Sequence, residues 1–513
     1  MTAFAPLDWI VVAAYVAILI VGGYAFSRTK TRDADEYFLA GHTVPAWLAA
    51  VSVLSATQSA ATFLGGPDYG YRSDYTYLGG VLSSVFAALF VARVLIPRFY
   101  ALKVTTVYEL LRVRYDATAM RWAGGMFLVG RVLAGGARVY LAAIAIAMVM
   151  FNSVDAPSII LAAAAVMIAA FLFTFVGGLR AVLWNDLIQF AIYIGSAIAV
   201  LIFLRMSIPA SNAEIVAALR ATPEGVNKLL LFDTATDLAK PFTLLTIFTG
   251  LFLLNTANAG LDQDTTQRLL ASPDARTGAR GLIWSALGSI PIIAMFMTIG
   301  VLLYIFYNRP DLMGASNTAA TSFSGEKVTV FVHYILTQIP PGLRGLVTIG
   351  VTAAAVATTN SALNAMSSVL ISDFYRPLRE RRGPAADVHY VRAGRWGMFV
   401  VGVAMFGMAV LSFYWQRYTD TPLLEFALSV MSFAYAGLLG VYFVAVFTTR
   451  GSTGGVVAAL VGGFLTVLAL QPWLGLVSAT IAFPYQLCAG TLVATLLAAL
   501  PRGRRAEASI ASG

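Results

Sequence analysis

Cysteine and histidine are scarce in this chain of 513 residues. The single cysteine, Cys488, lies in an apolar run, which excludes a disulfide framework and a cysteine-based metal site. The three histidines, His42, His333 and His389, are too scattered to predict a metal cluster. The Gly-rich stretch 451–455 follows no strand, so it is better explained as a loop and helix start than as a phosphate loop. Since no paired acids or nucleophile–base set is evident either, we expect neither an enzyme nor a resident cofactor.

Charged residues are also few, at 12% of the chain, whereas 59% of the residues are hydrophobic and the mean hydropathy is +0.79. Such a composition is far more apolar than that of a soluble protein and predicts a polytopic membrane protein in contact with lipid. The formal charge of +9 does not indicate nucleic acid binding, because the placement of the basic residues explains it.

Long apolar windows predict about thirteen membrane spans. These spans are 7–27, 45–66, 77–97, 122–151, 158–176, 185–206, 242–261, 282–307, 346–371, 396–415, 423–447, 455–471 and 481–500. Threading them alternately places nearly two thirds of the 34 Lys and Arg residues in loops on the side of Arg28. The positive-inside rule then predicts an outside N-terminus and a cytoplasmic C-terminus in the plasma (inner) membrane. The first span is expected to be retained, since its basic residues follow it instead of preceding it.

Two spans contain polar residues where an unbroken membrane helix would have apolar ones. The second span is filled with Ser, Thr and Gln over 55–62 and is predicted to stop at Gly65-Gly66-Pro67. The seventh span has two Asn, two Thr and two Gly over 249–260. Corresponding interruptions in the two halves of a transporter indicate an inverted repeat with its binding site at the interface. The alternative for the second span is a packed helix whose hydroxyls bond back to their own turn.

The ninth span is rich in small and hydroxylated residues over 351–373. This density of uncharged oxygens suits a sodium ion, but it is equally typical of a helix that packs closely against its neighbours.

Two arginines, Arg131 and Arg138, lie inside the fourth span, seven residues apart and therefore on one helix face. Arginine at a helix centre is unfavourable by about 2.5–3.5 kcal/mol on insertion scales, so such residues usually pair or line a cavity. A planar guanidinium binds carboxylates in a bidentate manner. We hypothesise that Arg138 holds an anionic organic substrate; the alternatives are a buried ion pair or a snorkelling side chain.

Motifs along residues 7 to 500 resemble the sodium/solute symporter family, which includes sodium/proline, sodium/galactose and sodium/sialic acid carriers. They are Asp35-Glu-Tyr-Phe-Leu-Ala-Gly41, Thr106-Val-Tyr-Glu109, Gly177-Gly-Leu-Arg180 with Trp184-Asn-Asp186, Asp262-Gln263 with Gln267-Arg268, Asp373-Phe-Tyr375 and Gly437-Leu-Leu-Gly440. The resemblance implies an all-α membrane protein of the leucine-transporter type, with two inverted five-helix repeats. The expected organisation is one transporter domain over 1–513, with a peripheral first helix at 7–27, repeats at 45–206 and 242–447, peripheral helices at 455–500 and a cytoplasmic tail at 501–513.

The resemblance also implies sites for sodium, the expected coupling ion. The main site joins the broken second span to the ninth span and involves Ser55, Gln58, Ala354, Ala357 and Thr358. The family usually has a hydroxyl where Ala357 stands, so one ligand is missing unless Thr359 replaces it. A second sodium is implied at Asp186, Asn360 and Ser361; the alternative is that Asp186 pairs with Arg180.

The solute is expected to contact six residues of the family's cavity. They are Thr57, Ser59, Thr62, Arg138, Asn258 and Asp262. We therefore predict sodium-coupled symport of a small organic solute, such as a carboxylate, by alternating access. A sodium-independent channel or uniporter and a transporter-like sensor are the alternatives, and the sequence leaves the oligomeric state open.

Overall fold

The computed structural model describes residues 4–27, 34–314, 316–317, 319, 322–323, 326–327, 329–383, 386–419 and 423–500. The predicted tail at 501–513 and the basic residues at 28–32 lie outside these residues.

The described chain is built almost entirely from helices. They are α1 (Pro6–Ser27), α2 (Ala34–Leu39), α3 (Ala46–Thr57), α4 (Ala60–Arg72), α5 (Thr76–Val94), α6 (Ile96–Leu102), α7 (Glu109–Arg114), α8 (Ala117–Phe151), α9 (Ala156–Met206), α10 (Asn212–Arg220), α11 (Leu244–Phe248), α12 (Gly250–Gly260), α13 (Gln263–Leu270), α14 (Ala275–Asn308), α15 (Pro310–Met313), α16 (Val330–Thr337), α17 (Leu343–Val369), α18 (Arg376–Glu380), α19 (Asp387–Thr419), α20 (Leu423–Phe447), α21 (Thr453–Ala469) and α22 (Phe483–Ala499). Two short strands, β1 (Ser322–Phe323) and β2 (Glu326–Lys327), pair antiparallel.

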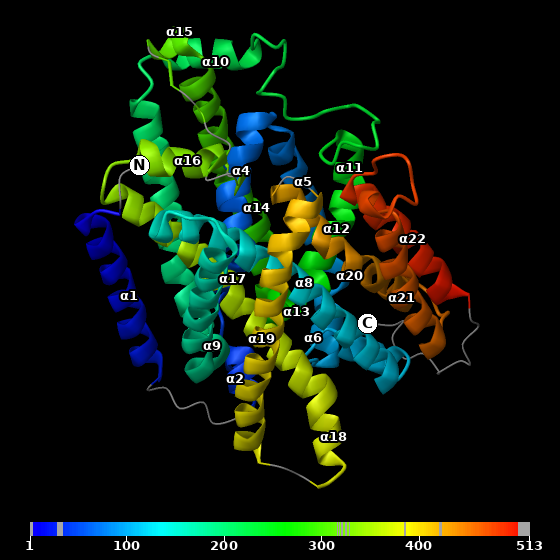
Figure 1. The fold of residues 1–513 in the computed structure, drawn as a ribbon. Helices are drawn as coiled ribbons and strands as arrows, with labels where there is room; N and C mark the ends of the chain where they lie inside the picture. The colour runs from blue at the N-terminus through cyan, green and yellow to red at the C-terminus, as the bar shows by residue number, and fades with distance from the viewer. Residues whose placement is uncertain are drawn as a thin grey trace.

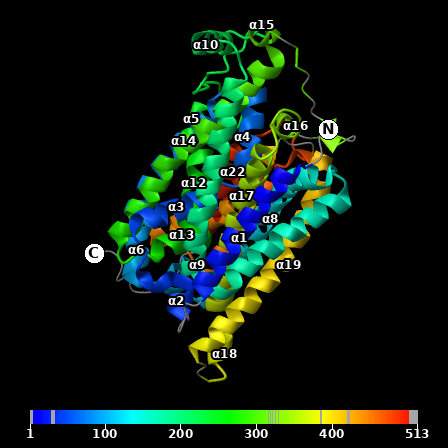
Figure 2. The same cartoon turned by 90° about the vertical axis from the view of Figure 1, so that its left-hand side faces the viewer.

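The helices form a bundle with α17 in its interior, α1 at one edge and α21 and α22 at the opposite edge (Figure 1). The short helices α10 and α15 lie at one end of the bundle and α18 lies at the other, as both views show (Figure 2). The core is continuous through the bundle, and α17 is buried along nearly its whole length.

Within the described residues, seven helices are long and apolar enough to cross a membrane, or nine if each of two bent helix pairs counts as one span. Four shorter apolar helices of 10–17 residues account for the remaining predicted spans. They are Pro6–Gly22, Ala156–Leu172, Thr453–Ala469 and Phe483–Ala499. Every predicted span therefore coincides with an apolar helix, but the count of about thirteen membrane crossings is not confirmed.

The predicted stop of the second span at Pro67 is wrong, because Pro67 lies inside α4 and the helix continues to Arg72. Its neighbours explain this. Gly65 lies against Leu424 and Gly66 against Phe296, so that added Cβ atoms would come within 3.1 Å and 3.2 Å of those residues. Close packing of this kind allows a proline inside a membrane helix. The glycines thus serve helix packing instead of ending the helix.

The predicted fifth and sixth spans both lie within α9, as the apolar segments Ala156–Leu172 and Leu179–Met206. Leu179 and Leu183 are buried against Leu48 and Ala49 of α3. The sixth span therefore begins at Leu179, six residues before the predicted start at 185.

Candidate functional site

The second predicted span is broken in the middle. Helix α3 ends at Thr57, α4 begins at Ala60, and the two axes differ by 65°. Gln58 and Ser59 have extended backbone, and the Ser59 hydroxyl caps α4 by accepting from the Ala61 N–H at 3.2 Å. The Thr62 N–H, which would bond the Gln58 carbonyl in a regular helix, donates instead to the Ser59 carbonyl at 2.9 Å. The break therefore leaves carbonyl oxygens at the end of α3 outside the helical ladder.

The seventh predicted span is broken in a similar way. Residues Leu244–Gly260 and Gln263–Leu270 meet at an angle of 50°. Asp262 caps the second part, since its carboxylate accepts from the Asp264 N–H at 3.0 Å. The prediction that spans two and seven are the broken ones is confirmed.

A cavity of about 170 Å³ lies between these two broken spans. Five of the six residues expected to contact the solute line it, together with Gln58. These five are Thr57, Ser59, Thr62, Arg138 and Asn258. Asp262 is not among the lining residues of this cavity.

Sequence reasoning missed several polar residues of the same cavity. They are Tyr77, Ser84, Asn255, Thr265, Ser285 and Ser289. Ser285 and Ser289 are one helical turn apart on α14, a spacing of hydroxyls in an apolar span that could have indicated a lined cavity. The cavity wall thus carries hydroxyl and amide groups around one guanidinium.

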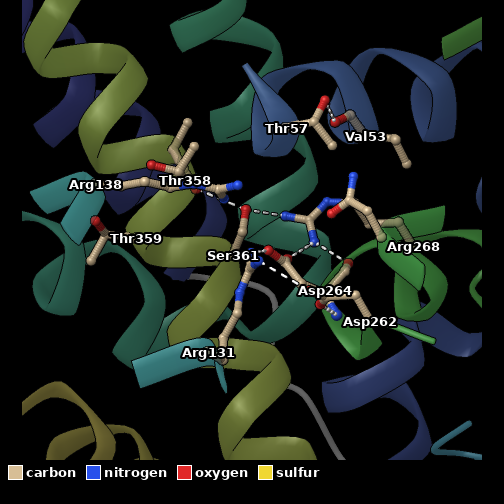
Figure 3. Close-up of polar contacts among 12 residues, drawn as sticks. Val53, Thr57, Arg131, Arg138, Asp262, Asp264, Arg268, Thr358, Thr359 and Ser361 are labelled. Carbon is tan, nitrogen blue, oxygen red and sulfur yellow. Dashed lines mark hydrogen bonds and ion pairs between the residues drawn. The ribbon is translucent and has the colours of Figure 1, made fainter. Parts of the chain in front are cut away.

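The two arginines of α8 have different surroundings. The Arg131 guanidinium is buried and pairs with Asp262 at 3.1 Å and also with Asp264 (Figure 3). Arg138 lines the cavity, and its nearest polar contact is the Met431 sulfur at 3.3 Å. Within the described residues no carboxylate lies within ion-pair distance of Arg138. The ion-pair alternative holds for Arg131 and not for Arg138.

A second buried guanidinium, that of Arg268 on α13, connects three other helices. It donates to Ser52 of α3 at 2.8 Å, pairs with Asp186 of α9 at 3.0 Å and contacts Ser361 of α17. It also pairs with Asp264 at 2.7 Å, so that Asp264 lies between the two arginines (Figure 3). Sequence reasoning missed Arg268, although Asp264 and Arg268 have the i, i+4 spacing of a helical ion pair.

The residues expected to hold the main sodium ion are all buried. Ser55 and Gln58 lie at the end of α3, whereas Ala354, Ala357 and Thr358 lie on α17, and α3 and α17 are in contact. The Thr358 hydroxyl donates to the Ala354 carbonyl at 3.0 Å.

Several hydroxyls of this region do bond back to their own helix. Thr57 donates to the Val53 carbonyl at 2.8 Å, and Thr359 donates to the Ala355 carbonyl at 2.7 Å. The lone pairs of such hydroxyls can still accept or coordinate, so this geometry is compatible with either interpretation of the small-residue spans.

The residues expected around a second sodium surround Arg268. Asp186 and Ser361 both contact its guanidinium, and Asn360 lies beside Ser361 on α17. One carboxylate oxygen of Asp186, Oδ1, is buried without a hydrogen-bond partner in the described chain. The alternative partner Arg180 is wrong, since Arg180 donates to the Thr43 hydroxyl at 3.1 Å.

Comparison with known proteins gives consistent matches. The profile of the sodium:solute symporter family matches residues 37–463. The sodium/sialic acid symporter SiaT of Proteus mirabilis is 27% identical over 91% of this chain and 90% of its own length. The human sodium-coupled monocarboxylate transporter 1 is 24% identical over 92% of this chain and 74% of its own length.

A solved structure of the substrate-bound outward-open state of a Na+-coupled sialic acid symporter has a TM-score of 0.80 with this chain. It is 24% identical in sequence, and the match covers 97% of this chain and 98% of that one. This similarity confirms the predicted all-α fold of the leucine-transporter type.

Proposed function

Because this chain belongs to the sodium:solute symporter family, a family of transporters and not of enzymes, we propose that it couples sodium entry to the uptake of a small organic anion. The two relatives named above transport sialic acid or monocarboxylates with sodium, which supports a carboxylate as the solute. Transport proceeds by alternating access around the cavity between the broken spans.

The observation that carries this proposal is the guanidinium of Arg138 in that cavity. A cation within a membrane span is unfavourable unless a partner binds it. Arg131, on the same helix, has two carboxylate partners from the protein, whereas Arg138 has none within the described residues. An anionic solute provides the missing partner, and the hydroxyl and amide groups of Thr57, Ser59, Thr62 and Asn258 bind its remaining polar atoms.

The main sodium ion is proposed to bind between Ser55 and Gln58 on one side and Ala354, Ala357 and Thr358 on the other. The Arg268 guanidinium contacts both Ser52 and Ser361. Ser55 lies one turn from Ser52, and Thr358 lies one turn from Ser361, so both groups stand beside a fixed contact between the two helices.

A second sodium ion is proposed at Asp186, Asn360 and Ser361. Arg268 and Ser52 both bond Oδ2 of Asp186, which leaves Oδ1 for the cation. Asp262 is proposed to act on the solute indirectly, because the Tyr435 hydroxyl donates to Asp262 and also lies 3.4 Å from the side-chain oxygen of Asn258, which lines the cavity.

The proposed orientation has the N-terminus outside and the C-terminus in the cytoplasm, within the plasma (inner) membrane. The predicted spans and orientation place the loops 207–241 and 308–345 outside, and the helices α10 and α15 of these loops lie at the same end of the bundle (Figure 1). The proposed repeats are 45–206 and 242–447, flanked by the peripheral first helix and the helices at 455–500.

The test is uptake into proteoliposomes of labelled carboxylates, amino acids and sugars, with and without an inward sodium gradient. We expect at least one carboxylate to accumulate only with the gradient. Uptake that is independent of sodium would favour a uniporter and contradict the proposal.

A further inference from the structure

Gln189, in the sixth predicted span, is fully buried in α9. Neither the oxygen nor the nitrogen of its side-chain amide has a hydrogen-bond partner within the described chain. A buried amide without a partner is destabilising, so Gln189 is a candidate for binding a group that the described chain does not supply.

The neighbours of Gln189 along α9 show which helices it faces. Asp186, Gln189, Tyr193 and Ser196 lie within an arc of about 80° on the helix surface. The Tyr193 ring packs against Phe63 of α4, with ring centroids 5.5 Å apart. Ser196 lies so close to Gly350 of α17 that a Cβ atom there would be 2.0 Å from its hydroxyl. Gln189, between Tyr193 and Ser196 in this arc, therefore faces the space between α4 and α17.

Contacts on either side of Gln189 fix its level along the broken span. Asp186, three residues before Gln189, accepts a hydrogen bond from the Ser52 hydroxyl at 2.5 Å. Tyr193 contacts Phe63 four residues after it. The midpoint between Ser52 and Phe63 falls between residues 57 and 58, where α3 ends and the break begins, so Gln189 is level with that break.

The same alignment holds for α17, which runs antiparallel to this part of α9. Ser196 lies against Gly350, and Asp186 shares the Arg268 guanidinium with Ser361. Seven residues before Ser196 is Gln189, and seven residues after Gly350 is Ala357. Gln189 is therefore level with the position where the family usually has a hydroxyl.

We infer that the side-chain oxygen of Gln189 is a ligand of the coupling ion and takes the place of the hydroxyl missing at Ala357. This inference rests on the proposed function. An amide oxygen is a neutral, hard donor of the type that bare alkali and alkaline-earth cations prefer. The cation site then draws on three elements: the break after α3, the middle of α17, and Gln189 of α9.

The test is the sodium concentration that gives half-maximal solute uptake in proteoliposomes. Gln189→Leu should raise it about tenfold or more, the effect of losing one contact to a charged group. Ala357→Ser should lower it, and the double variant should return toward the wild-type value. Solute affinity at saturating sodium should stay unchanged in all three, because Gln189 and Ala357 do not line the solute cavity.

Asn364→Leu is the matched control. Asn364 is also buried with both amide atoms unpartnered in the described chain, but it lies seven residues beyond Ala357, about 10 Å along α17. The variant Asn364→Leu should therefore leave the half-maximal sodium concentration unchanged.

An unchanged half-maximal sodium concentration in Gln189→Leu, or an equal rise in Asn364→Leu, would overturn the inference. If Gln189→Leu does not fold, the conservative Gln189→Asn takes its place: its shorter side chain withdraws the amide oxygen from the cation and should also raise the half-maximal sodium concentration, and an unchanged value would overturn the inference. Wild-type uptake that needs no sodium would contradict the proposed function itself, which separates the two failures.

Discussion

The two arginines of α8 are two turns apart on one helix, yet they belong to different parts of the molecule. Arg131 enters a buried network with Asp262 and Asp264, whereas Arg138 reaches the cavity between the broken spans. The network holds α8 to α13, and through Arg268 it extends to α3, α9 and α17. The cavity also contains a guanidinium, that of Arg138, but no carboxylate of the described residues lies within ion-pair distance of it.

This difference indicates which of the two arginines can bind a solute: the one that has no carboxylate partner among the described residues. Breaking a buried ion pair is strongly destabilising because the remaining charge stays in a medium of low polarity. An arginine in a polar cavity can instead exchange water for a ligand. The comparison predicts that variants of Arg131 affect folding and that variants of Arg138 affect transport.

The largest expected effect comes from Arg131→Ala. The substitution removes a positive charge that pairs with the carboxylates of Asp262 and Asp264. Removal of one partner of a buried ion pair destabilises proteins by about 3–5 kcal/mol. We expect little folded protein in detergent, measured as the monodisperse fraction and the thermal unfolding temperature. Arg131→Lys, which keeps the charge, should recover part of the stability. A fully stable Arg131→Ala protein would contradict the structural role of the network.

Arg138→Ala is expected to fold and to lose transport. Removing two charge-assisted hydrogen bonds to a carboxylate should lower uptake about 100-fold or more. Initial uptake rates of the carboxylate found in the proteoliposome screen provide the measurement, with the unfolding temperature as the control. Unchanged uptake would remove Arg138 from the solute site.

Asp264→Asn and Asp262→Asn sharpen the comparison within the network. Asp264 pairs with both Arg131 and Arg268, whereas Asp262 pairs with Arg131 alone among the residues that the structure describes. Asp264→Asn should therefore lower the unfolding temperature more than Asp262→Asn. Equal effects in both variants would mean that the Arg268 contact of Asp264 contributes nothing to stability.

The broken spans were predictable from the sequence because Ser, Thr, Gln and Asn replace apolar residues there. The position of the first break was not, since the Gly65–Pro67 signal reflects close packing against α14 and α20, and the Ser59 cap sets the true start of α4. Polar residues within a span thus predict that the helix breaks, but the packing of the neighbouring helices decides where.

The lining of the cavity was predicted better than the ion pairs. Five of the six expected solute contacts line one cavity, because the resemblance placed them residue by residue. The partners of Arg131 and Asp186 were missed because they lie 131 and 82 residues away along the chain, where no local spacing indicates them.

A change at Lys228, a buried cation in the loop before α11, is expected to have the smallest effect. Its ammonium group donates to the Tyr71 and Ser73 carbonyls at 2.8 Å each and lies 4.3 Å from the centre of the Tyr304 ring. Burial lowers the pKa of Lys228 to about 8, from 10.5. Between these two values the unfolded chain binds more protons than the folded one, so stability should increase as the pH rises through this window.

The measurement is the resistance of this loop to limited proteolysis at pH 8 and at pH 10. Lys228→Met should abolish the difference between the two conditions. An identical pH dependence in wild type and in Lys228→Met would show that another group titrates there.

The most direct test of the central claim is concentrative uptake of a carboxylate by wild-type and Arg138→Ala proteoliposomes under an inward sodium gradient. The wild type should raise the internal carboxylate above the external concentration, and lose this ability when an ionophore collapses the gradient. Arg138→Ala should only equilibrate slowly. Accumulation that survives the collapse, or that is equal in the two proteins, would contradict sodium-coupled transport of an anion held by Arg138.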